Sequence, residues 1–100
     1  MKYDLTEKLH FDSDPILVIK DTELTIKSDA EVVLELMDIM MNNGEFAAAK
    51  LAMPLLLSEK DQKKLEKLHL KMNDYVEVMM AAASLAMGED PSEPEASGEE

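Results

Sequence analysis

The chain has 100 residues, a net charge of −12 and no cysteine, and every one of its basic residues is a lysine. This length makes one domain with one modest core, which leaves little room for a deep catalytic cleft. An acidic chain without arginine is a poor match for nucleic acid or for an anionic membrane surface. The lack of cysteine excludes disulfides, thiolate metal ligands and a cysteine nucleophile.

Targeting and spanning segments are not apparent in the sequence. The first residues contain no apolar signal core, and the longest stretch with few charges, residues 78–87, is about half of the ~20 residues that a spanning helix needs. We therefore expect a soluble, cytoplasmic protein.

The folded part of the chain begins with a β-type pattern. Residues 15–20 are rich in branched apolar side chains, and residues 23–27 alternate between polar and apolar. Two such runs with two polar residues between them, here Asp21 and Thr22, predict a β-hairpin over residues 15–27.

Helical patterns follow over residues 29–87. Ser28 and Glu31 form a capping box, which predicts a first helix over residues 29–43. Leu36, Met37 and Met40 lie among the apolar residues of its expected inner face.

Further signals divide the rest of the helical part. Pro54 is expected to end or kink a second helix that begins at Glu45 and runs to about Ala52. Ser58 is expected to cap a third helix, and residues 70–72 to make a break. The last helix is expected to start at residues 73–74 and to end at Gly88.

The last thirteen residues, 88–100, contain six acids and no large apolar residue, so we predict a disordered acidic tail. The predicted fold is thus α+β: an N-terminal β-hairpin followed by a compact bundle of three to four short helices. We expect a single folded domain over residues 1–87.

Patterns that carry chemistry are missing from the sequence. His10 and His69 have no partner at the spacing of a metal site or a catalytic pair. Residues 12–14 resemble the start of a calcium loop, but Leu17 stands where that loop needs glycine. We therefore expect a protein that is not an enzyme and that uses no cofactor, metal or small-molecule substrate.

Methionine is unusually frequent, with nine residues. Its flexible side chain is over-used on surfaces that accept varied partners, although any single methionine more often belongs to the core. The apolar pattern assigns both Met79 and Met80 to the inner face of the last helix. Neighbours on a helix point about 100° apart, however, so the two side chains cannot both face inward. We predict a partner-binding surface on and beside the last helix, made by Met72, Tyr75, Met79, Met80 and Met87.

Lysines recur at helical spacing just before that helix. Lys60, Lys64, Lys67 and Lys71 step by 4, 3 and 4 residues, which places them on one face of a continuous helix. A solvated face is the simpler interpretation. The alternative is that these lysines border the binding surface and meet an acidic partner or the chain's own acidic tail.

The stretch from residue 55 to residue 75 resembles the second half of the short tail assembly chaperones of long-tailed bacteriophages and prophages of Gram-positive hosts. Gln62, Leu65, Leu68 and Leu70 follow the family's leucine-rich pattern, and residues 74–75 match the Asp-Tyr pair that opens its last helix. The glycine at 88, the acidic tail, residues 17–20 and the helix after residue 28 are also similar to the family.

The resemblance implies a function and its partners. Such chaperones bind the tape measure protein and keep it soluble until tail tube subunits polymerise around it, and in many phages a longer, frameshifted product recruits the tail tube protein. The resemblance also implies that the protein lies in the cytoplasm of the host cell. The alternative is a small acidic regulatory protein, of the antitoxin or anti-activator type, that covers a basic surface; self-association is compatible with either.

Overall fold

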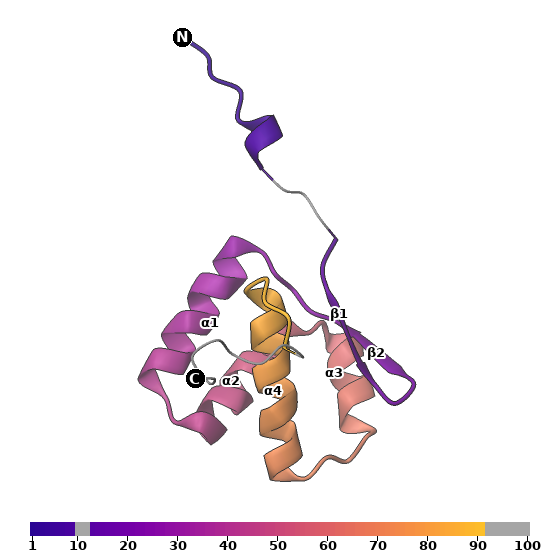
Figure 1. Cartoon of the computed structure of the whole chain (residues 1–100). Coiled ribbons are helices and arrows are strands. Elements are labelled where there is room, and N and C mark those ends of the chain that lie inside the picture. Colours follow the sequence, from indigo (N-terminus) through magenta and orange to yellow (C-terminus); the bar gives the residue numbers. More distant parts are fainter. Residues whose placement is uncertain (10–12, 92–100) are drawn as a thin grey trace, which may run out of the picture.

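A computed structural model describes residues 1–9 and 13–91 of the chain (Figure 1). Its elements are η1 (Thr6–Lys8), β1 (Ile16–Ile19), β2 (Thr22–Thr25), α1 (Ala30–Asn42), α2 (Glu45–Leu56), α3 (Glu59–Glu66) and α4 (Met72–Ala86). The predicted α+β fold is confirmed, since an antiparallel hairpin precedes the four helices. The prediction of disorder for residues 92–100 lies outside the described residues.

The hairpin has its turn one residue earlier than predicted. Ile19 pairs with Thr22, so the two loop residues are Lys20 and Asp21 rather than residues 21–22. Lys20 has a φ of 55°, the left-handed conformation that lets such a short loop reverse the chain. The predicted alternation in the second strand is confirmed, because Leu24 and Ile26 are buried.

Backbone and carboxylate bonds attach this hairpin to the helices. The Lys27 N–H donates to the Leu56 carbonyl at 2.9 Å, at the end of α2. The Thr25 N–H donates to Asp61 Oδ2 of α3 at 3.0 Å, and Lys64 Nζ lies 3.3 Å from Asp61 Oδ1. Asp61 is a buried carboxylate with both oxygens in use, as a buried charge requires.

The capping box predicted at Ser28 is wrong. The Ser28 hydroxyl donates instead to Asp14 Oδ1 at 2.7 Å. The N-cap residue of α1 is Asp29, whose side chain makes no capping hydrogen bond. The helix still starts within a residue of the predicted position. It ends where the Asn43 side-chain amide donates to the Ile39 carbonyl, which would otherwise lack a partner.

Pro54 does not end α2, which continues to Leu56. Proline has no N–H, so the only helical hydrogen bond lost is the one to the Lys50 carbonyl. Lys50 is exposed, so water can reach that carbonyl. The continuation buries Met53 and Leu56 in the core, which offsets the loss of one helical bond.

The predicted cap of α3 is confirmed, because Ser58 Oγ accepts the Asp61 N–H at 3.2 Å. The break after α3 spans residues 67–71 and comes earlier than the predicted residues 70–72. His69, with a φ of 52°, takes a left-handed conformation there and redirects the chain. Gly88, with a φ of 84°, follows α4, as its predicted role as a stop signal requires.

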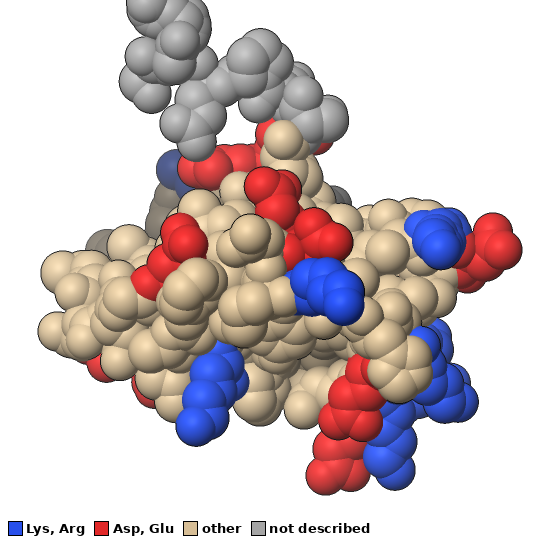
Figure 2. Space-filling view, turned by 90° about the horizontal axis from the view of Figure 1, so that it is seen from below, with Lys and Arg blue, Asp and Glu red and all other residues tan. Residues whose placement is uncertain are grey.

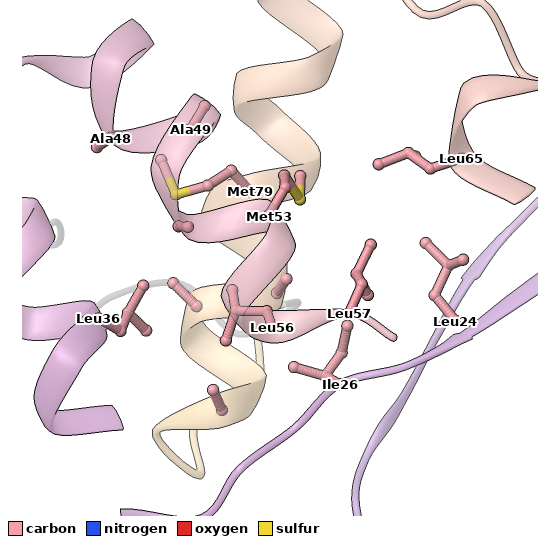
Figure 3. Close-up of a cluster of buried hydrophobic side chains, with 14 of the residues drawn as sticks. Leu24, Ile26, Leu36, Ala48, Ala49, Met53, Leu56, Leu57, Leu65 and Met79 are labelled. Atoms are coloured by element: carbon pink, nitrogen blue, oxygen red, sulfur yellow. The ribbon is translucent and has the colours of Figure 1, made fainter. Parts of the chain in front are cut away.

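The core lies where α2 packs against α4, with α1, α3 and the hairpin around them (Figures 1 and 3). Its fully buried large side chains are Leu24, Ile26, Leu36, Met53, Leu56, Leu57 and Met79. Apart from these and Val76, the two central helices bury alanines: Ala48, Ala49 and Ala52 of α2, and Ala82, Ala83 and Ala86 of α4. Small side chains allow two helices to approach closely.

Candidate functional site

The structure separates the methionines that were assigned together to the binding surface. Met79 is 1% exposed and belongs to the core, whereas its neighbour Met80 is 50% exposed. The inner-face assignment is therefore wrong for Met80 and for Met37, and Met87 of the predicted binding surface is exposed as well. The reason is the step of about 100° between helical neighbours: Met79 takes the direction that faces the core, so Met80 points away from it.

Met72 and Tyr75 do come together, in a groove of about 640 Å³ between α2, α3 and α4. We call this the α2–α4 groove. It is lined by Phe46, Ala47, Lys50, Met53, Pro54, Gln62, Leu65, Glu66, Met72 and Tyr75. Figure 2 views the molecule from the end at which α2 and α4 begin, where uncharged surface predominates and acidic and basic side chains are scattered over it.

The lining of the α2–α4 groove is apolar at its base and at its mouth. Met53 and Leu65 are buried, while Phe46 and Met72 remain about half exposed. An aromatic ring and a flexible thioether at the mouth can adjust to the shape of a partner side chain. This combination suits an apolar helix face, since amphipathic helices bind in such grooves.

Tyr75 provides the groove with a polar group. Burial raises the pKa of the Tyr75 phenol, and the nearby negative charge of Glu66 raises it further. The phenol is therefore a neutral hydrogen-bond donor at any physiological pH. Lys50 and Glu66 are exposed at the groove and supply one charge of each sign.

The predicted lysine stripe is not continuous. Helix α3 ends at Glu66, so Lys67 is its C-cap, and Lys71 lies beyond the break as the N-cap of α4. Lys60, Lys63, Lys64 and Lys67 still gather with Glu59 around a shallow surface cavity of about 540 Å³. Lys71 does not line it, because the left-handed residue 69 turns the chain away.

One of these lysines already has structural partners. Lys64 Nζ lies 3.3 Å from Asp61 Oδ1 and donates to the Glu23 carbonyl of β2 at 3.1 Å. Lys64 therefore joins α3 to the hairpin, and a partner would have to compete with these contacts. Lys60, Lys63 and Lys67 are exposed on the same element.

Sequence reasoning missed an apolar face on α1. Ala30, Leu34, Met37 and Met41 are all exposed, and they recur at helical spacing. The signal was present in the sequence, since this helix carries apolar residues on more than one side. The assignment of Met37 to the core side hides this outer face, because the exposed row runs through Met37.

Comparisons with protein-family models, curated proteins and solved structures found no match to this chain. Within residues 1–9 and 13–91, no helix is long and apolar enough to cross a membrane. The same residues hold no group of three or more His, Cys, Asp or Glu side chains arranged to bind a metal ion.

Proposed function

We propose that this chain is a phage tail assembly chaperone, whose α2–α4 groove binds an apolar helical segment of the tape measure protein and keeps that protein soluble. One observation carries the proposal: three helices leave an apolar groove of about 640 Å³, with Phe46 and Met72 half exposed at its mouth. The resemblance of residues 55–75 to the chaperone family supports the same conclusion, because Met72 and Tyr75 of the groove lie in that segment.

The charge of the chain fits this role. A chaperone that holds an apolar segment must keep the complex in solution, and a net charge of −12 on 100 residues opposes aggregation. The tail tube protein is the further partner that the resemblance implies. No step of this function requires a cofactor.

The test is co-expression with the very long reading frame that follows the gene of such a chaperone. Met72→Glu places a charge at the mouth of the groove, and we expect the long protein to become insoluble as it does without the chaperone. Met80→Glu is the matched control, because Met80 lies on the same helix with nearly the same exposure but outside the groove. It should leave the long protein soluble.

Two results would contradict the proposal. If Met72→Glu folds, as judged by circular dichroism, and still keeps the long protein in solution, the groove is not the binding site. If the gene neighbours a toxin gene instead of tail genes, the acidic regulatory binder becomes the better explanation.

A further inference from the structure

Helix α1 carries a continuous apolar stripe on its outer side. Ala30, Leu34, Met37 and Met41 step by 4, 3 and 4 residues, so they lie in one row along about 17 Å of helix. All four are exposed, with Leu34 at 66% and Met41 at 81% of their full accessible surface.

The stripe is not needed to hold α1 on the domain. Leu36 is fully buried, and Val32, Val33, Ile39 and Met40 pack against the core, so this helix already has a complete inner face. A helix on the surface of a protein is ordinarily polar on its opposite side. A contiguous exposed apolar surface marks an interaction site.

Acidic side chains border the stripe on one side. Each of these acids, Glu31, Glu35 and Asp38, comes one position after a residue of the stripe. All three therefore lie about 100° around the helix from the stripe, on the same side. The sequence has no basic residue between Lys27 and Lys50. Within the part of the chain that the structure describes, none of these three carboxylates forms an ion pair.

We propose that this α1 face, the stripe with its acidic border, binds a basic amphipathic helix of a partner protein. Leucine-type side chains of that helix would cover Leu34 and Met37, and lysines or arginines along one of its edges would meet Glu31 and Glu35. A second copy of this chain fits less well, because it brings the same acidic border and a further charge of −12.

The α1 face and the α2–α4 groove share no lining residue, so each can be tested without the other. The probe is a fluorescent leucine–lysine peptide that forms an amphipathic helix of about five turns, followed by anisotropy at physiological salt. We expect it to bind the wild-type chain, and a leucine–glutamate peptide of the same pattern not to bind. Free peptide alone gives the baseline.

Leu34→Glu separates docking on the stripe from general attraction of cations to an acidic protein. The change adds negative charge, so attraction alone predicts tighter binding, whereas loss of a buried leucine contact predicts binding weakened by about tenfold or more. Met80→Glu adds the same charge on α4 and should leave the affinity for the peptide near that of the wild type. Met41→Gln, without added charge, should weaken binding by about threefold or more.

Three outcomes would overturn the inference. Equal or tighter peptide binding by a folded Leu34→Glu protein means that charge alone attracts the peptide. Loss of binding in Met72→Glu but not in Leu34→Glu places the peptide in the groove. A wild-type dimer in analytical ultracentrifugation that Leu34→Glu converts to a monomer means that a second copy occupies the face.

Discussion

Met79 and Met80 are adjacent on α4, yet the structure gives them opposite roles in stability. Met79 is 1% exposed and lies among the fully buried side chains of the core, whereas Met80 is 50% exposed. Met79→Ala removes the buried thioether and leaves a cavity, which costs about 2–5 kcal/mol. Met80→Ala removes a half-exposed side chain and introduces the best helix former, so its effect should stay within about 0.5 kcal/mol.

Urea and thermal unfolding followed by far-ultraviolet circular dichroism measure this difference. In a domain of this size each kcal/mol corresponds to about 4–8 °C, so Met79→Ala should lower the melting temperature by at least about 8 °C. Met80→Ala should melt close to the wild type. Equal losses in the two variants, or a larger loss for Met80→Ala, would mean that α4 is rotated relative to the described structure.

The remaining predictions concern caps, a buried carboxylate and a phenol. Ser58→Ala should lower the unfolding free energy by about 1 kcal/mol in urea titrations. Ser28 caps no helix, so Ser28→Ala should change this free energy by less than about 0.5 kcal/mol. A larger loss for Ser28→Ala than for Ser58→Ala would mean that Ser28 does cap α1. Asp61→Ala removes the acceptor of a β2 N–H and should cost about 1–3 kcal/mol by the same assay, and a neutral effect would show that this bond does not hold the hairpin. The pKa of Tyr75 is raised above its ordinary 10.0, so its stabilising contribution is present below pH 10 and is lost as the pH rises through the higher folded value. Glu66→Gln should shift the ultraviolet titration of Tyr75 to lower pH, and an unchanged titration would show that the Glu66 charge does not act on the phenol.

Features that depend on neighbours in the sequence were predictable. The alternation at Leu24 and Ile26 sets the inner face of the hairpin, and Ser58 caps α3 through a residue only three positions away. The glycine at 88 likewise ends α4 by its own conformational freedom. In each case the decisive contact lies within a few residues.

Features that depend on contacts between residues far apart in the sequence were not predictable. The hydroxyl of Ser28 bonds to Asp14, fourteen positions away, and no local pattern indicates that this bond replaces the cap. The lysine stripe was extrapolated through His69, whose left-handed conformation breaks it. The α2–α4 groove joins three helices, so only its α4 residues, Met72 and Tyr75, could be selected from the sequence.

The buried alanines of α2 and α4 have a consequence for the shape of the α2–α4 groove. Both helices form walls of the groove, and the distance between two packed helix axes follows the size of the side chains at their contact. Residues such as Ala49 and Ala83, which no partner can reach, therefore set the width of the opening. A change of one methyl group there would alter which side chains fit between the walls, so the shape of the groove depends on positions hidden inside the domain.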